Sequence, residues 1–391
     1  MKNYENKYKN IRVAVTDGGY KHSLGIVRKL GEIGVKPYVI AHKKRSIAGI
    51  SKYAKDEMIL TETYDLKELL QLLNRHKIEL VILVGTNSFR KIVPWKKELE
   101  RENIKIITVD ADVQNIAFSK PLTYELAVSM GVPIPKTIYP TSFKMLKEIE
   151  DEIIYPCVIK GLYEVGGNIV DYAYDFNDLL LKYEKICNKY GLTEKSGLPM
   201  LQEYIPGYGC AFFAIYNKGT CGLTFQHKRI REYPVTGGAS SCAESYKSDM
   251  IEKYGRCLLD KLEWHGVAMV EFKLNKKGQP ILMEINPKFW GSTDLALEAG
   301  VNFPKALMDI YLNEEIEYSN FYKYPFRYHW PFDGDILHII DKPKNILNFF
   351  KDLFNFKVKT NIHFSDPLPS LYMAAVFIRS LPIILIRKLY V

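Results

Sequence analysis

The first 110 or so residues alternate short apolar runs with amphipathic stretches. The apolar runs, which are typical of buried strands, lie at 11–16, 37–41, 80–84 and 105–109. After the first run, apolar residues recur at helical spacing at Leu24, Val27, Leu30 and Ile33. A second helix is expected over 65–76. Strands and helices that alternate in this way predict an open parallel α/β sheet, and we assign residues 1–112 to it.

The pattern changes after residue 112. A helix is expected over 119–130, and from 153 to 290 strands are separated by turns that contain Gly and Asn, with further helices near 175–189 and 248–262. This mixture predicts an α+β unit, to which we assign residues 113–310. From 311 the chain is aromatic and irregular, and we treat 311–391 as a C-terminal extension.

Charge and composition narrow the classes of partner. The formal net charge of +9 favours anionic partners but is too small to indicate nucleic acid. The six cysteines form no CxxC pair, which argues against a structural zinc site and fits a reducing compartment. No signal peptide is visible at the polar N-terminus. The turn at Asp17, Gly18 and Gly19 lacks the GxGxxG spacing, which favours a tight turn over a dinucleotide site.

Residues 267–286 are predicted to form a β-hairpin that carries a carboxylate pair. A turn centred between Lys277 and Gly278 places Glu271 opposite Glu284, and alternation adds Asn286 to the same face. The other face is apolar: Val270, Phe272, Leu274, Ile281, Met283 and Ile285. Opposed like charges destabilise a sheet, whereas a shared magnesium ion, which prefers oxygen ligands, would turn the repulsion into attraction. The alternative is a solvated face with two unrelated glutamates.

A basic strand and a glycine loop follow one another at 225–240. Alternation places His227, Arg229 and Arg231 on one face of this strand, where three cations would suit a phosphoryl group in transfer. Backbone N–H groups of 237–240 could bind an anion. The alternatives are a solvated charged strand and a flexible loop.

Five segments, in this order and spacing, resemble the ATP-grasp superfamily in its carboxylate–amine ligase or carbamoyl-phosphate-synthase-like branch. They are SKPLTYELAVSMGVPIPKT at 119–137, YPCVIKG at 155–161, LQEYIPGYG at 201–209, FQHKRIREYPVTGGASS at 225–241 and MEINPKFWGS at 283–292. The similarity covers about 1–310. It implies an ATP-grasp fold with a lid at about 133–205, preceded by the open parallel α/β domain.

The resemblance also implies roles for individual residues. Lys120 and Lys160 would hold the ATP phosphates, and a strand would bind the adenine edge through Gln202, Glu203, Tyr204 and Ile205. His227 would lie beside the nucleotide. Catalysis would involve Arg231, Arg229 and Lys288, and magnesium, or manganese in its place, would bind Glu271, Glu284 and Asn286. Two features depart from the family: the loop at 161–170 has few glycines, and Lys288 replaces an arginine, which loses the bidentate fork.

The activity that the resemblance implies is ADP-forming amide synthesis. A small-molecule or sugar carboxylate would be phosphorylated by ATP, and an amine, either an amino acid or ammonia, would displace phosphate from the acyl phosphate. Surface-polysaccharide or cell-envelope synthesis is one setting for such a reaction. The alternatives are an enzyme that phosphorylates bicarbonate or carbamate and a non-catalytic ATP-binding regulatory module.

The last 21 residues, 371–391, are largely apolar. Arg379, Pro382, Arg387 and Lys388 interrupt them, which argues against a membrane-spanning helix. The segment either packs onto the catalytic domain or lies in a membrane interface with its basic side chains at anionic headgroups. We therefore expect a cytoplasmic protein, with peripheral contact to the inner face of the cell membrane as the second option.

Overall fold

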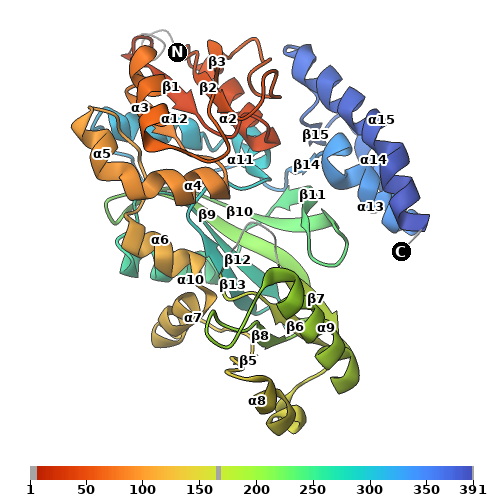
Figure 1. Cartoon of the computed structure of the whole chain (residues 1–391). Coiled ribbons are helices and arrows are strands. Elements are labelled where there is room, and N and C mark those ends of the chain that lie inside the picture. The colour runs from red at the N-terminus through yellow and green to blue at the C-terminus, as the bar shows by residue number, and fades with distance from the viewer. Residues whose placement is uncertain (1–6, 164–168, 390–391) are drawn as a thin grey trace.

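The computed structural model describes residues 7–163 and 169–389 (Figure 1). Its first sheet has the order β3-β2-β1-β4, and its paired strands are all parallel. The strands are β1 Val13–Val15, β2 Tyr38–Ala41, β3 Asp56–Ile59 and β4 Leu80–Ile82. The predicted open parallel α/β sheet is thus confirmed. Two details were wrong, because the edge strand β3 is too polar to recognise, and 105–109 forms only a single bridge, from Lys105 to Leu80.

Helices surround this sheet and connect it to the rest of the chain. They are α2 Lys21–Glu32, α3 Leu66–Arg75, α4 Thr86–Ile92 and α5 Lys96–Arg101, followed by α6 Ala111–Phe118 and α7 Lys120–Ser129. The apolar spacing expected for α2 is confirmed, because Leu24, Val27 and Leu30 are all buried. Ser119 caps α7 by accepting a hydrogen bond from the N–H of Leu122, which places Lys120 at the start of that helix.

A seven-stranded sheet of order β13-β12-β9-β10-β11-β14-β15 forms the centre of the molecule. Its strands are β9 Tyr208–Asn217, β10 Thr220–Tyr233, β11 Ala239–Ser245, β12 Gly266–Leu274, β13 Pro280–Asn286, β14 Arg327–His329 and β15 Lys359–Thr360. The helices that accompany it are α10 Asp249–Lys261, α11 Thr293–Ala299 and α12 Phe303–Tyr311. Strand β9 is buried on both faces, since Phe213 and Ile215 join one core cluster while Phe212 and Tyr216 join another. Its unbroken apolar run follows from that position.

A smaller antiparallel sheet of order β5-β8-β6-β7 lies at the far end of the molecule from the N-terminal sheet (Figure 1). It consists of β5 Thr137–Ile138, β6 Cys157–Lys160, β7 Val170–Ala173 and β8 Met200–Glu203. Helices α8 Phe143–Glu148 and α9 Phe176–Tyr190 pack on it and share its own hydrophobic core. This sheet is formed within the segment for which a lid was predicted.

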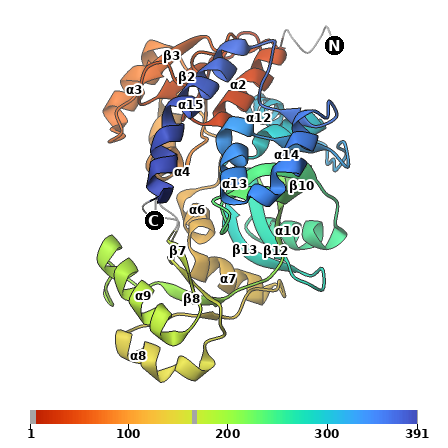
Figure 2. The same cartoon turned by 90° about the vertical axis from the view of Figure 1, so that its right-hand side faces the viewer.

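The C-terminal extension is ordered rather than irregular. Strands β14 and β15 extend the central sheet, and the extension adds α13 Ile336–Asp341, α14 Ile346–Leu353 and α15 Pro367–Leu389. Figure 2 shows α15 lying against the N-terminal unit. Asp366 fixes the start of this helix, because its carboxylate accepts hydrogen bonds from Nε of Arg28 at 2.9 Å and from Oγ of Ser51 at 2.7 Å.

Helix α15 has one packed side and one open side. Met373 and Phe377 are buried, whereas Leu371 and Ile378 are each 65% exposed. Pro382 lies inside the helix, so the expected interruptions do not end it. Residues 367–384, with a mean hydropathy of 1.4, are long and apolar enough to cross a membrane by length and composition alone, and 22% of this stretch is buried.

Candidate active site

The predicted carboxylate pair is present on the central sheet. Strands β12 and β13 pair in antiparallel register with Glu271 opposite Glu284, and Asn286 lies on the same face. A bulge between this pair and the turn shifts the register, so that Phe272 faces Leu282. The expected apolar face is therefore corrected. Strict alternation predicted Ile281 and Met283 in the core, but Leu282, which lies between them, packs there instead.

A cavity of about 280 Å³ brings the predicted site residues together. It lies between the small antiparallel sheet β5-β8-β6-β7 and the central sheet, because its lining includes residues of β6, β8, β10, β12 and β13. The predicted residues that line it are Lys120, Lys160, Gln202, Glu203, Tyr204, Ile205, His227, Arg229, Glu271, Glu284, Asn286 and Lys288. Arg231 is the one predicted site residue that does not line it.

The two carboxylates have different electrostatic surroundings. Glu284 accepts a hydrogen bond from Nδ2 of Asn286 at 2.8 Å and lies 3.5 Å from Nζ of Lys120. Burial alone would raise the pKa of Glu284, but Lys120 and Asn286 outweigh it and lower the pKa to about 2. Burial raises the pKa of Glu271, and Glu284 raises it further, while Arg229 at 2.7 Å opposes both. A cation between the two carboxylates would remove this repulsion.

The two predicted phosphate lysines lie on neighbouring backbone, because the N–H of Lys120 donates a hydrogen bond to the carbonyl of Leu162 at 3.0 Å. Lys160 ends β6 and donates a hydrogen bond from Nζ to Oε1 of Gln202 at 2.7 Å. The amide of Gln202 is held in turn by the hydroxyl of Tyr124 at 2.9 Å. Burial, together with the charge of Lys120, lowers the pKa of Lys160 to about 8. Gln202 is only 3% exposed, so it positions Lys160 rather than offering an open binding surface.

His227 lines the cavity but is not a cation there. Its Nε2 lies 2.7 Å from Oγ of Ser292, and burial followed by the charge of Arg229 lowers its pKa to about 3. The expected triple cationic face is therefore wrong at this position. Arg229 remains charged and forms its ion pair with Glu271 at 2.7 Å.

Arg231 points to the opposite face of β10 from Arg229. The register of β10 against β11 shifts between these two residues, so Ile230 is an extra residue and the alternation is reversed beyond it. The guanidinium of Arg231 is 3% exposed and bonds to Asp335 at 2.7 and 2.9 Å and to Asp352 at 2.7 Å. The expectation that Arg231 shares a face with Arg229 is corrected by this bulge.

The predicted adenine strand and glycine loop both reach the cavity. Glu203 is the last residue of β8, and its Oε1 accepts a hydrogen bond from the N–H of Lys136 at 3.0 Å, so the exocyclic amine of adenine would compete with that bond. Gly237, Gly238 and Ser240 contribute to the lining. Residues 164–168 of the loop after Lys160 lie outside the described residues.

Several lining residues were not predicted. Met269 and Lys273 lie two residues to either side of Glu271, and strict alternation along β12 would have revealed both. Ser292 ends the MEINPKFWGS motif, which is the signal that could have identified it. Met283 lines the cavity only because of the bulge, and nothing local in the sequence indicates that.

Comparison with known proteins agrees with this geometry. Residues 200–331 match the family described as ATP-grasp in the biosynthetic pathway with Ter operon. The carbamoyl phosphate synthase large chain of Methanosarcina barkeri is 24% identical over 276 residues, which cover 67% of this chain and 25% of that protein. The same protein of Clostridium acetobutylicum is 19% identical over 66% of this chain and 24% of its own length. The aligned part thus spans about a quarter of these relatives.

Solved structures show the same fold. The biotin carboxylase domain of Hydrogenobacter thermophilus 2-oxoglutarate carboxylase, in complex with MgADP and bicarbonate, superposes with a TM-score of 0.66 at 16% identity over 79% of this chain and 71% of that one. N5-carboxyaminoimidazole ribonucleotide synthetase of Thermus thermophilus superposes with a TM-score of 0.61 at 13% identity over 79% and 80%. The chain therefore has an ATP-grasp fold, and residues 200–331 match an ATP-grasp family, while the curated relatives named above are carbamoyl phosphate synthase large chains.

Proposed function

We propose that the protein is an ATP- and magnesium-dependent ligase that joins a carboxylate to an amine. The observation that carries the proposal is the cavity itself, in which the Glu271–Glu284 pair and Asn286 are surrounded by the cations Lys120, Lys160, Arg229 and Lys288. Such a mixture suits a metal-bound triphosphate, since the carboxylates suit the metal and the cations suit the phosphate oxygens. We also propose that the substrates are a carboxylate and an amine, and that the reaction belongs to surface-polysaccharide synthesis.

Each group in the cavity has a defined task in this reaction. Lys120 and Lys160 hold the phosphates, and Arg229 with Lys288 stabilises the charge that develops as a substrate carboxylate oxygen attacks the γ-phosphorus and the bond to ADP breaks. The amine then forms a bond to the acyl carbon of the resulting acyl phosphate. Phosphate leaves with the bonding electrons, and the amine loses a proton.

The chemistry of the donor set fits magnesium. Glu271, Glu284 and Asn286 supply two carboxylates and one amide oxygen, which leaves further positions for phosphate and water, the usual shell of this ion. The proposed set has only two carboxylates, and within residues 7–163 and 169–389 there is no larger cluster, of three or more His, Cys, Asp or Glu side chains, that could hold a metal. When bound, magnesium would neutralise phosphate charge.

A second activity is favoured by the relatives. Carbamoyl phosphate synthase and the biotin carboxylase crystallised with bicarbonate suggest bicarbonate or carbamate as the phosphorylated group. An assay of ADP release with bicarbonate alone, and then with a panel of carboxylates and amines, separates the two activities. An ATP-binding module without catalysis would release ADP with none of them.

The expected products are ADP, phosphate and an amide, because the cationic groups of the cavity would suit a transferring phosphoryl group. With a carboxylate labelled with oxygen-18, one labelled oxygen should appear in the released phosphate, since the oxygen that attacks phosphorus leaves with it. Mass spectrometry of the phosphate measures this transfer. Release of pyrophosphate and AMP, or phosphate without label, would contradict the acyl-phosphate route.

We also propose peripheral contact of α15 with an anionic membrane surface. Leu368, Leu371 and Ile378 form an outward apolar side with exposures of 61%, 65% and 65%, and Arg379 lies next to them. An apolar side with a basic residue beside it suits the headgroup region of anionic lipids. The inward side of the helix remains part of the protein core through Met373 and Phe377.

The double variant Leu371→Glu/Ile378→Glu should lose binding to phosphatidylglycerol vesicles and keep its melting temperature. Burying two carboxylates in the interface costs several kcal/mol, whereas exposed positions contribute little to folding. Vesicle co-sedimentation and thermal melting measure the two effects. Lys144→Glu, a charge change on α8 far from this helix, is the control. Unchanged vesicle binding in the double variant would show that α15 does not contact the membrane.

A further inference from the structure

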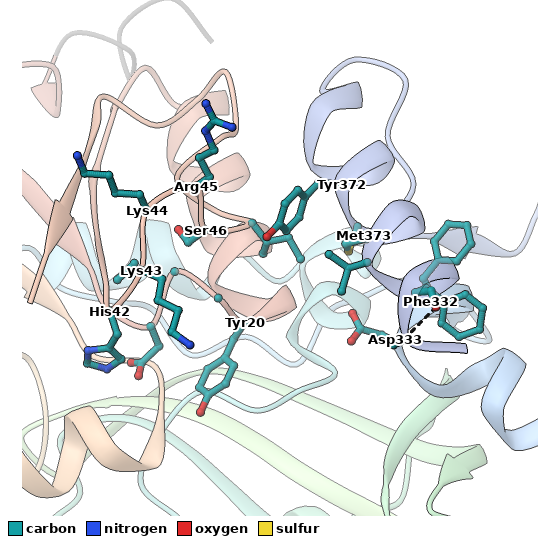
Figure 3. A pocket seen from close by; sticks show the side chains of 18 of the residues that line it. Tyr20, His42, Lys43, Lys44, Arg45, Ser46, Phe332, Asp333, Tyr372 and Met373 are labelled. Atoms are coloured by element: carbon teal, nitrogen blue, oxygen red, sulfur yellow. Dashed lines mark hydrogen bonds between the residues drawn. The ribbon is translucent and has the colours of Figure 1, made fainter. Parts of the chain in front are cut away.

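A second cavity, of about 550 Å³, lies at the carboxyl edge of the N-terminal sheet and is separate from the proposed catalytic cavity in its lining residues. It is formed by the turn after β1, the loop after β2 and the inward side of α15 (Figure 3). Ligands of open parallel sheets bind at this edge, where the strand order reverses about the first strand. The family-like segments of the sequence do not include α15, which forms one whole wall.

One side of this cavity is a basic loop with a fixed backbone. Residues Lys43, Lys44 and Arg45 follow β2 and are all exposed. The carboxylate of Glu57 accepts hydrogen bonds from the N–H groups of Arg45 at 2.6 Å and Ser46 at 2.8 Å. The loop therefore presents three consecutive cations from a rigid support.

The opposite side is apolar and aromatic. It comes from one stripe of α15 and from the segment that precedes α13, as Figure 3 shows for Phe332, Tyr372 and Met373. Helical spacing brings the α15 residues into this stripe: Tyr372, Met373, Val376, Phe377, Ser380 and Ile384. A ligand that fills the cavity must therefore combine a charged end with an apolar body.

Two of the three acidic residues of the lining are engaged by other parts of the protein. Asp17 is already satisfied, since its carboxylate accepts hydrogen bonds from the N–H of Gly85 at 2.7 Å and from Oγ of Ser88 at 2.6 Å. The charge of the Asp333 carboxylate interacts with the Lys21 ammonium, whose Nζ also donates a hydrogen bond to the Asp333 backbone carbonyl at 3.4 Å. Glu62 is exposed and is the remaining acid of the lining. Within the described part of the chain, the side chains of Lys43, Lys44 and Arg45 form no ion pair, which favours an anionic head.

The contacts of Lys21 show that the two cavities are close to each other. A methyl group placed on Gly291, which lines the catalytic cavity, would lie 3.9 Å from Cε of Lys21. The same lysine contacts Asp333, which lines the second cavity. A ligand in the second cavity would thus be separated from the proposed catalytic cavity by little more than one side chain.

We infer that this second cavity binds an amphipathic anion, a molecule with a phosphate or carboxylate head at Lys43–Arg45 and an apolar chain along α15. The free energy of binding would come from both ends. Charge-assisted hydrogen bonds hold the head, and burial of the chain against Val376 and Phe377 supplies the hydrophobic part. Neither an inorganic anion nor a neutral chain would make both sets of contacts.

Isothermal titration calorimetry with dodecyl phosphate, below its micelle concentration, tests the inference. The full chain should bind dodecyl phosphate at least about tenfold more tightly than inorganic phosphate or dodecanol, since each lacks one set of contacts. Val376→Glu, which places a charge in the apolar wall, and the triple variant Lys43→Ala/Lys44→Ala/Arg45→Ala should each weaken binding by about tenfold or more. Ile378→Glu, two positions along the same helix but outside the lining, should leave affinity unchanged.

The outcomes separate the sites and the sources of the ligand. Equal weakening by Val376→Glu and Ile378→Glu, with unchanged melting, would mean adsorption on the outside of α15 and would overturn the inference, as would equal affinity for inorganic phosphate. Competition by phosphatidylglycerol vesicles would identify a bilayer lipid as the source of the head and chain, whereas binding unaffected by vesicles would identify a soluble amphiphile. Binding is measured without ATP, so failure here leaves the proposed ligase activity untouched.

Discussion

Replacing Glu284 with glutamine is expected to abolish turnover and leave the fold intact. The amide has the same shape and can still bond to Asn286, but it removes one of the two charges that face each other across β12 and β13. Loss of a metal carboxylate should cost about 4 kcal/mol of transition-state stabilisation, roughly a thousandfold in rate. Steady-state release of ADP with magnesium present measures the loss, and thermal melting checks the fold.

Glu244→Gln is the matched control for this variant. Glu244 is also a poorly exposed glutamate on the central sheet, and it is also paired with cations, through Arg327 at 2.7 Å and Lys228 at 3.2 Å. It does not line the catalytic cavity. Turnover should therefore survive in this variant. If Glu284→Gln released ADP at a rate close to that of the unchanged protein, the proposed metal site would be wrong.

Replacing Arg231 with methionine is expected to lower the free energy of unfolding by about 3 kcal/mol, because two buried carboxylates lose its guanidinium. Asp352 then keeps Arg327 at 3.0 Å, and Asp335 keeps His329 at 3.1 Å. Asp335 is fully buried and Asp352 is 6% exposed at its side chain, so water cannot replace the guanidinium. Thermal and urea unfolding, followed by circular dichroism, measure the loss.

Arg229→Met provides the contrast, because Arg229 lines the catalytic cavity two residues away on the other face of the strand. This variant should lose more turnover than Arg231→Met when both are assayed well below their melting temperatures. The opposite pattern, with a stable Arg231→Met protein that no longer turns over, would restore the catalytic role that the family resemblance implies for Arg231.

The site was predictable wherever one strong local constraint determined the geometry. The turn near Lys277 and Gly278 limits the register of β12 and β13 to within one residue. Counting residues back from the turn along each strand therefore predicts that Glu271 lies opposite Glu284. The helix that begins at Lys120 and the strand that ends at Lys160 carry ordinary apolar patterns. Motif order then associated segments that are far apart in the chain.

Bulges caused two of the errors in the site. One extra residue at Ile230 turns Arg231 away, and another at Met283 exchanges the core and cavity positions beside the carboxylate pair. A bulge depends on how the sheet packs against its neighbours, which the alternation of a single strand does not encode.

The C-terminal extension could not be predicted for a related reason. Strand β14 has only three residues and exists because it pairs with β11, more than eighty positions earlier. The cavity beneath α15 likewise depends on contacts between the two ends of the chain. Local apolar spacing carries no information about such partners.

The ion pair between Arg28 and Asp366 has a consequence for the order in which the protein can be assembled. Arg28 is 5% exposed within the N-terminal unit, yet the carboxylate that balances its charge lies 338 positions later. A buried guanidinium without a partner is costly, so α2 cannot reach its final packing while the growing chain is shorter than about 366 residues. The N-terminal sheet, although synthesised first, therefore completes its core among the last parts of the molecule.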